Sequence, residues 1–256
     1  MISSFVAAPD IVTDKRYSSG LVCEYQACGG QLIAGGNSPL IRCWDVASEK
    51  LRNTFNSKSD ASLTTLTSAW EYDLNDGYSG LGPDIVIGGY GNGSLRLYDT
   101  RSDTGDPVLH INDGRNRQSL SRRRKFSSFD EHTSWIIDVS FTTYGGRHEI
   151  VSGCVSGSIK FWDLRYSSSV RTIEHKMQMT ALAAHSNVPV FATGSPNQFI
   201  KIMAYDGTTQ QIIRYHGPDE RLGPVSCLKF HPHMPFLAAG FSNDGIVSVY
   251  GSRGLQ

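Results

Sequence analysis

A pair of histidines separated by one proline, His231-Pro232-His233, could hold a metal ion. Two imidazoles at this spacing can share Zn²⁺, but a zinc site needs further ligands to complete a tetrahedron. The surrounding sequence KFHPHMPFLAAG favours a strand, a proline turn and a second strand, and MTALAAHSNVPVFATG repeats this pattern with His185 in the place of His231. We therefore interpret the histidine pair as part of a turn and predict no metal site.

Other patterns that could carry catalysis or bind a cofactor are incomplete. His148-Glu149 lacks the second histidine of the HExxH zinc-protease pattern. The glycine-rich run Gly88–Gly93 precedes a hairpin rather than the helix N-terminus that a phosphate loop needs, and we expect Asn92-Gly93 to form a two-residue turn with positive φ angles. The sequence contains no GxSxG motif around a serine nucleophile. The sequence predicts no enzyme activity and no cofactor.

The cysteines also argue against a metal or redox site. Their number is odd and none forms a CxxC pair, so we interpret them as reduced core thiols. They are Cys23, Cys28, Cys43, Cys154 and Cys227.

A basic, serine-rich segment within residues 102–130 is the strongest candidate for regulation. It carries arginines from Arg115 onward, the basic run Arg122, Arg123, Arg124 and Lys125, and the serines Ser119, Ser121, Ser127 and Ser128. Arg122 and Arg124 precede Ser127 by five and three residues, a spacing that basophilic kinases favour, and phosphate would add about two negative charges there. The alternatives are a solvated loop without a special role and a site for an anionic partner, either lipid or nucleic acid.

The composition is typical of a folded protein whose net charge creates no strong electrostatic field. The 24 acidic residues balance 24 Lys and Arg, so net charge attracts neither nucleic acid nor an anionic membrane. Apolar residues make up 39% of the chain, and no apolar run approaches the roughly 18 residues of a membrane span. We expect an intracellular protein of the cytoplasm.

These candidate residues lie in a sequence that repeats itself five times. The segments IAGGNSPLIRCWDV, VIGGYGNGSLRLYDTR, VSGCVSGSIKFWDLR, FATGSPNQFIKIMAY and LAAGFSNDGIVSVYG share small residues, a turn and alternating apolar positions. Equivalent positions near the ends of these segments are Asp45, Asp99, Asp163, Ala204 and Gly251, spaced by 54, 64, 41 and 47 residues. The two shorter spacings match a propeller blade of about 40–45 residues.

The short apolar or alternating runs within each repeat predict strands, and no segment has a sustained helical period. One example is VFATG, FIKIMAY and QQIIRY with MTALAAH in front. We predict an all-β, WD-repeat β-propeller over residues 1–256 with about five four-stranded blades, whose sheets pack face to face. The last repeat has three strands, so Ile2–Ala7, within an outer strand and linker at 1–16, could supply a fourth or end a preceding blade.

Several residues stand at positions with a structural role in WD repeats. His132, Ser152 and Trp162 match a hydrogen-bonding chain whose usual aspartate is replaced by Ser156, so we expect a partial network. The complete set of positions is Trp44, Asp45, Tyr98, Asp99, His132, Ser152, Trp162 and Asp163. We assign them to the fold rather than to catalysis.

Four stretches resemble the C-terminal propeller of raptor, the regulatory-associated protein of the TOR kinase. They are SGLVCEYQACGGQLIAGGNSPLIRCWD, EHTSWIIDVSF, TALAAHSNVPVFATGSPNQFIKI and VSCLKFHPHMPFLAAGFSNDGIVSVY. The resemblance implies a non-catalytic adaptor of TOR complex 1, which brings substrates and regulators to the kinase and is recruited with the complex to a lysosomal or vacuolar membrane. It also implies a seven-bladed ring, of which this chain would hold five blades and one further strand.

The alternative function belongs to a different class. A membrane-lipid-binding propeller would use the basic loop 115–125, whereas such propellers generally carry a paired-arginine motif within a blade. We therefore place the adaptor first. Its expected partners are TOR complex subunits and other proteins, without nucleic acid.

Overall fold

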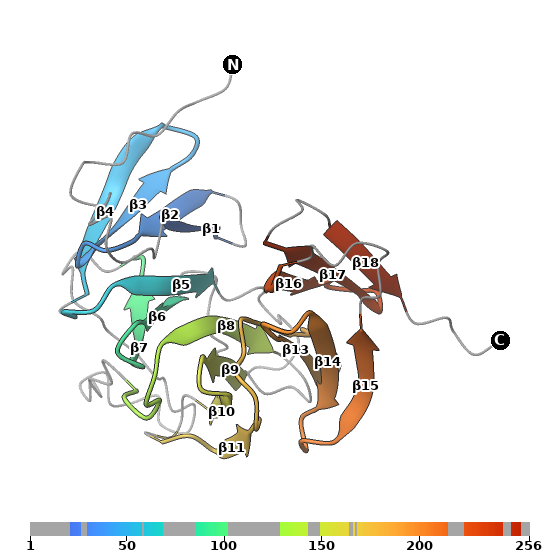
Figure 1. Cartoon of the computed structure of the whole chain (residues 1–256). Helices are drawn as coiled ribbons and strands as arrows, with labels where there is room; N and C mark the ends of the chain where they lie inside the picture. Colours follow the sequence, from blue (N-terminus) through green and yellow to red (C-terminus); the bar gives the residue numbers. More distant parts are fainter. Residues whose placement is uncertain are drawn as a thin grey trace, which may run out of the picture. The chain divides into compact units, whose positions relative to one another are not determined.

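The computed structural model describes residues 21–26, 30–57, 59–68, 85–101, 129–142, 149–163, 166, 168–214, 223–242 and 247–251. Every regular element in these residues is a β-strand, and the strands of each sheet pair antiparallel with their neighbours (Figure 1). Among them there is no helix long and apolar enough to cross a membrane. The strands belong to two compact units, divided between Ile136 and Ile137.

The first unit contains two sheets. One has the strand order β1-β2-β3-β4, with β1 at Val22–Tyr25, β2 at Gln31–Gly35, β3 at Leu40–Asp45 and β4 at Lys50–Asn56. The other has the order β5-β6-β7, with β5 at Leu63–Ser68, β6 at Ile85–Tyr90 and β7 at Leu95–Asp99. Each strand therefore pairs with the next strand along the chain.

Sheets of the same meander type make up the second unit. The first of them comprises β8 (Ile136–Thr142), β9 (Glu149–Cys154), β10 (Ser158–Asp163) and β11 (Arg171–Glu174). The next comprises β12 (Ala181–Ala184), β13 (Val190–Gly194), β14 (Phe199–Ala204) and β15 (Thr209–Arg214). The last comprises β16 (Val225–Phe230), β17 (Phe236–Phe241) and β18 (Val247–Gly251).

This architecture confirms the predicted WD-repeat β-propeller class. Three sheets have four strands and two have three among the described residues, and the final repeat has the three strands expected from its sequence. Strand β13 coincides with the predicted VFATG run. The segment Ile2–Ala7 lies outside the described residues, so its proposed pairing stays a prediction.

The β5-β6-β7 sheet gains a further pairing at its outer edge. Phe129 and Leu95 exchange two backbone hydrogen bonds of 2.9 Å. These bonds use the edge of β7 that faces away from β6. The last described residue before the basic segment, Arg101, lies two residues after the end of β7. Both described ends of this segment are thus attached to one sheet of the first unit.

In the first unit, the two sheets bury apolar side chains between their faces. The shared cluster contains Ile33, Ile41, Cys43, Phe55, Leu63, Leu66, Val86, Tyr90 and Tyr98. All six residues of β6 are buried, which means that both faces of this strand are covered. Full burial of one such aliphatic or aromatic side chain contributes about 1.5–3 kcal/mol.

In the second unit, the sheet β12–β15 contributes to two cores. Leu182, Phe191 and Met203 join a cluster with Phe161 and Ile159 from β10. The alternate positions, including Ala183, Ala192 and Ile200, pack with residues of β16 and β17. Each face of this sheet therefore packs against a neighbour, as the repeat predicted.

Glycines at the turn before the third strand permit a close backbone approach. Gly93 and Gly157 have φ angles of +86° and +98°. A Cβ on Gly93 would lie 2.1 Å from the carbonyl oxygen of His132, and a Cβ on Gly157 would lie 2.1 Å from that of His175. The equivalent positions elsewhere hold Pro39 and Gln198, and Gln198 adopts the left-handed conformation with φ of +64°.

The prediction of a two-residue turn at Asn92-Gly93 is wrong in its detail. Four residues separate β6 from β7, and Gly93 has a positive φ while Asn92 does not. The Gly93 amide donates to the carbonyl of Tyr90 at 3.1 Å, and the Asn92 side chain accepts hydrogen bonds from the amide and hydroxyl of Ser94. The side-chain acceptor stabilises a wider turn, in which only the glycine needs the left-handed conformation.

We expect Gly157→Ala to destabilise the fold far more than Gly207→Ala. Both glycines have φ near +90°, so alanine pays a backbone strain of about 1–2 kcal/mol at either place. A Cβ at Gly207 meets nothing closer than Ile173 at 3.7 Å, whereas one at Gly157 collides with two backbone carbonyls. Urea unfolding should therefore show a loss of about 3 kcal/mol or more for Gly157→Ala. Equal losses in the two variants would contradict the clash as the cause.

Candidate functional site

The aspartates at the end of the third strands act on the turn that follows. Asp45 accepts a 2.7 Å hydrogen bond from the amide of Ser48, and this bond lowers the pKa of its carboxyl group. Asp99 is buried and accepts from the amide and the guanidinium of Arg101, in a salt bridge of 2.9 Å. Asp163 occupies the equivalent position on β10 and is also buried. The hydrogen bonds of Asp45 and Asp99 place both carboxylates in structural turns.

The aromatic residues that precede these aspartates make different polar contacts in the two units. In the second unit, the indole of Trp162 is fully buried and its Nε1–H donates to Ser152 Oγ at 2.7 Å. In the first unit, the hydroxyls of Tyr98 and Tyr90 share a hydrogen bond. Burial raises the pKa of Tyr90 to about 12 and raises that of Tyr98 further, so both phenols are neutral. Trp44, on β3, is likewise buried.

Of the predicted hydrogen-bonding network of His132, Ser152 and Trp162, the structure shows the bond between Trp162 and Ser152. His132 belongs to the first unit, where its ring is buried and its carbonyl packs on Gly93. Ser156, expected in place of the usual aspartate, contacts Cys154 Sγ at 3.1 Å. The hydrogen bond from Trp162 to Ser152 is the observed part of this network.

The histidines of the HPH motif serve as turn caps. Nδ1 of His231 accepts hydrogen bonds from the amides of His233 and Met234 at 3.1 and 3.0 Å. The same atom of His185 accepts from the amide of Asn187 at 3.1 Å. Within the described part of the chain, no group of three His, Cys, Asp or Glu residues could hold a metal ion. The repeated cap supports the interpretation of this motif as a turn.

None of the cysteines that the structure describes forms a disulfide, and the prediction of core thiols is wrong for two of them. Cys43 and Cys154 are buried, whereas Cys23 and Cys227 are exposed; Cys28 lies outside the described residues. The Cys43 thiol donates to Gln31 Oε1 at 2.8 Å, and burial raises its pKa to about 11. Such a thiol is protonated and unreactive at neutral pH.

The candidate regulatory residues lie outside the described part of the chain. These are the serines Ser119, Ser121, Ser127 and Ser128 and the basic residues Arg122, Arg123, Arg124 and Lys125. The same holds for the whole of the loop 115–125 on which the lipid-binding alternative depends, and no described residue supports that alternative. His148 of the failed HExxH pattern is also undescribed.

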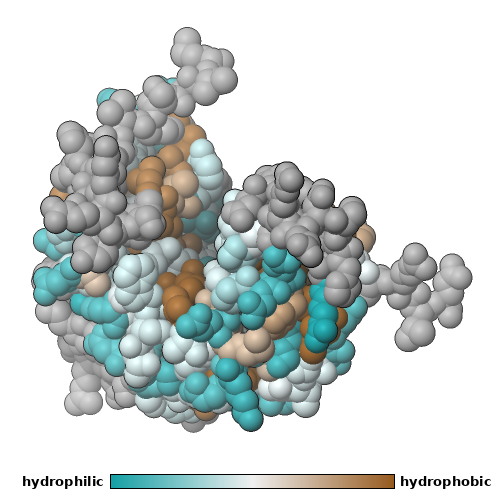
Figure 2. Space-filling view, viewed as in Figure 1, coloured by the Kyte–Doolittle hydropathy of each residue, from teal (hydrophilic) through white to brown (hydrophobic). Residues whose placement is uncertain are grey.

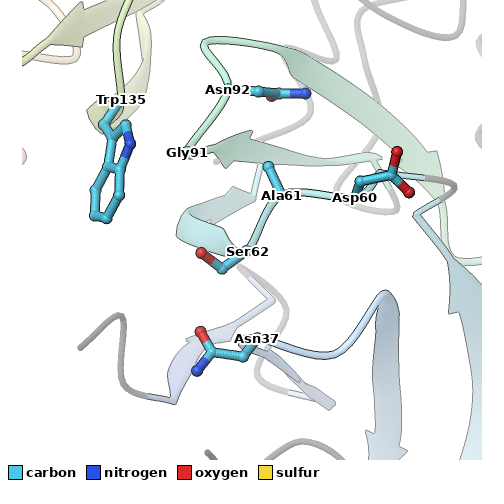
Figure 3. A pocket seen from close by; sticks show the side chains of 7 residues that line it. All are labelled: Asn37, Asp60, Ala61, Ser62, Gly91, Asn92 and Trp135. Atoms are coloured by element: carbon cyan, nitrogen blue, oxygen red, sulfur yellow. The ribbon is translucent and has the colours of Figure 1, made fainter. Parts of the chain in front are cut away.

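The first unit carries a cavity that sequence reasoning did not predict. It measures about 320 Å³ and is lined by Asn37, Asp60, Ala61, Ser62, Gly91, Asn92 and Trp135. Trp135 lies on one side, Asp60 on the opposite side, and Ser62 and Asn37 extend between them (Figure 3). The Trp135 side chain is 46% exposed, so its indole is available to a ligand.

Hydrogen bonds to main-chain carbonyls connect the segments that line this cavity. The amide of Leu63 donates to the carbonyl of Gly36 at 2.9 Å, and the amide of Gly91 donates to that of Ser62 at 3.0 Å. The Thr64 hydroxyl donates to the carbonyl of Ile136, the residue after Trp135, at 2.6 Å. The cavity is therefore built by the β2–β3 turn, the β4–β5 connection, the β6–β7 turn and the residue before Ile136.

Exposed apolar side chains occur elsewhere as well. In the visible face, hydrophobic residues are interspersed with hydrophilic ones (Figure 2). Val247 and Val249 of β18 are each 67% exposed, and Tyr25 of β1 is 58% exposed. The cavity differs from these positions because polar side chains surround its aromatic residue.

Comparison with known proteins gives consistent matches. The family model "WD domain, G-beta repeat" matches residues 123–163 and 209–251. The chain is 32% identical to "Target of rapamycin complex 1 subunit mip1" of Schizosaccharomyces pombe, with 98% of this chain and 17% of the relative covered. It is 30% identical to "Protein raptor homolog" of Dictyostelium discoideum, with 98% of this chain and 15% of the relative covered.

A solved structure supports the same fold. The crystal structure of Chaetomium thermophilum Raptor aligns with a TM-score of 0.72 at 22% identity, over 93% of this chain and 20% of that chain. At this identity the likeness concerns the fold alone. The chain spans about a sixth of the length of the first two relatives named above. Together, the matches confirm the resemblance predicted from the sequence.

Two buried histidines of the second unit have lowered pKa values, which predicts that acid destabilises this unit. Burial is the main cause that lowers the pKa of His175 and of His185, while backbone hydrogen bonds oppose it. His231 and His233 also lower the pKa of His185 through their charge. Because Nδ1 of His185 accepts the Asn187 amide, protonation of this nitrogen would also remove the turn cap.

We expect the second unit to lose stability as the pH falls below the ordinary histidine value of about 6.5. The unfolded chain then binds protons that the folded His175 and His185 resist, so the stability is present at pH 7.5 and declines toward the lower folded pKa values. His185→Asn keeps a side-chain acceptor for the turn and cannot titrate. Urea unfolding between pH 7.5 and 5 should show a shallower decline in this variant, and identical slopes would contradict the assignment.

Proposed function

We propose that this chain, a raptor-type WD-repeat domain, acts as a non-catalytic scaffold in a TOR complex 1, where it helps to bring substrates and regulators to the kinase. The single observation that carries the proposal is the sequence similarity over 98% of the chain to proteins named as subunits of that complex or as a raptor homolog. The relatives are much longer, so the partners of the whole protein are part of the proposal.

The described architecture suits a scaffold. Its polar residues at equivalent repeat positions are engaged in turns and interior hydrogen bonds, as Asp45, Asp99 and Trp162 are. Loops between rigid strands can vary without loss of the packed core, and such loops commonly carry binding residues. We place the domain in the cytoplasm and propose recruitment to a lysosomal or vacuolar membrane through the complex.

Affinity purification tests the scaffold role directly. With the protein tagged where it is naturally encoded, we expect mass spectrometry to find the TOR kinase among the recovered proteins. Gly207→Ala should retain the kinase, while Gly157→Ala should lose most of it, because the second substitution disrupts the packed turn. Absence of the kinase from purifications of the unchanged protein, in growing and in starved cells, would contradict the proposal.

We further propose that phosphorylation of Ser127 regulates the basic segment. The support is the position of Arg122 and Arg124 five and three residues before this serine. Phosphate would add about −1.5 to −2 charge beside four basic residues. We expect phosphopeptide mapping of the protein from growing and starved cells to detect a change at Ser127. Peptides covering the four serines that never carry phosphate would remove this proposal.

A further inference from the structure

We propose that the cavity lined by Trp135 and Asp60 binds an arginine or lysine side chain of an extended segment in a partner protein. This inference does not depend on which complex the domain joins. It assigns a ligand chemistry to a site formed entirely within the first unit.

The composition of the lining favours a long cationic side chain. Asp60 supplies a carboxylate, Asn37 and Ser62 supply polar oxygens, and no lysine or arginine is among the described residues that line the cavity. An exposed indole attracts a cation over its face, with about 0.5–1 kcal/mol at an exposed site. The lining is therefore complementary to a positive group and repels an anionic one.

The arrangement of the residues on the two sides of the cavity also fits a long cationic side chain. Trp135 and Asp60 lie on opposite sides of the cavity, with Ala61 between them, and the Asp60 carboxylate points away from Trp135, at the far edge of the cavity (Figure 3). Lysine and arginine carry an apolar stem and a charged head, and they commonly lay the stem along apolar surface while the head reaches a polar partner. The stem would contact Trp135 and Ala61, and the head would reach the Asp60 carboxylate.

Gly91 keeps the cavity open. A Cβ at this position would lie 3.7 Å from both the Ser62 hydroxyl oxygen and the Trp135 ring, so a larger side chain would enter the space without a clash at its Cβ. The backbone of Gly91 does not have a positive φ. The equivalent turn of the second unit has Val155 at this position, and Gln178 stands in the place of Trp135. Gly91→Val is therefore a compatible substitution that fills the site.

The indole N–H resonance of Trp135 provides the readout, after assignment with Trp135→Phe. The probes are acetyl-Gly-Arg-Gly-amide, its neutral citrulline analogue and acetyl-Gly-Glu-Gly-amide, added to the whole chain at low ionic strength. We expect a saturable shift with the arginine peptide at a dissociation constant on the order of millimolar, and binding of the citrulline peptide about threefold weaker or more. The glutamate peptide should produce no saturable shift.

Substitutions separate the roles of the lining residues. Gly91→Val should abolish the shift, and Asp60→Asn should weaken arginine binding about threefold. Asp206→Asn removes an equal charge in the second unit and should leave binding unchanged, which makes it the matched control. A second control replaces Arg122, Arg123, Arg124 and Lys125 by alanine, because this chain's own basic segment could supply the same chemistry.

Three results would overturn the proposal. Equal affinity for the arginine and citrulline peptides would remove the cation as the ligand, and an unchanged shift in folded Gly91→Val would remove the cavity as the site. Tighter binding after the alanine replacements would assign the site to the chain's own basic segment instead of a partner. Recovery of the TOR kinase is measured independently, so each proposal can fail alone.

Discussion

The structure depends on one constraint, which is that each short sheet has two apolar faces and cannot cover either of them by itself. Face-to-face packing of neighbouring sheets satisfies this constraint within each unit. The sheet β12–β15 shows how the sequence meets it, because Ala181, Leu182 and Ala183 alternate along one strand. Leucine enters one core and the alanines enter the other, where larger residues of β16 and β17 fill the space.

Close packing of the sheets has consequences for the turns at their ends. Neighbouring backbones approach closely enough at Gly93 and Gly157 that a Cβ would overlap a carbonyl oxygen. Turn caps from side chains then hold the remaining loop residues, with Asp45 before Ser48 and His185 before Asn187. The loops are thereby fixed although they have no regular structure. A binding site made from such loops needs little ordering when a ligand arrives, which favours recognition by few contacts.

The sequence predicted the strands better than the contacts between them. Runs such as VFATG are short, apolar and bounded by turn residues, so their strand character is local information. The bond between Tyr90 and Tyr98 was not predicted, since Gly88 stands where the second unit has Ser152 and no local signal announces the replacement. The Asn92-Gly93 turn was assigned correctly to its place but not to its length, because Asn92 also accepts from Ser94.

The cavity was beyond sequence reasoning for a related reason. Its lining residues come from four connections between Asn37 and Trp135, and only the registers of the two sheets in the first unit bring these connections together. The signal that could have drawn attention was Trp135 itself, an aromatic residue placed just before an apolar strand where the next repeat has Gln178. Repeats that diverge in this way keep apolar residues at the buried strand positions and differ in the residues of their turns. Since a propeller presents many similar turns, such a difference at one of them gives a partner a way to distinguish that turn from the others.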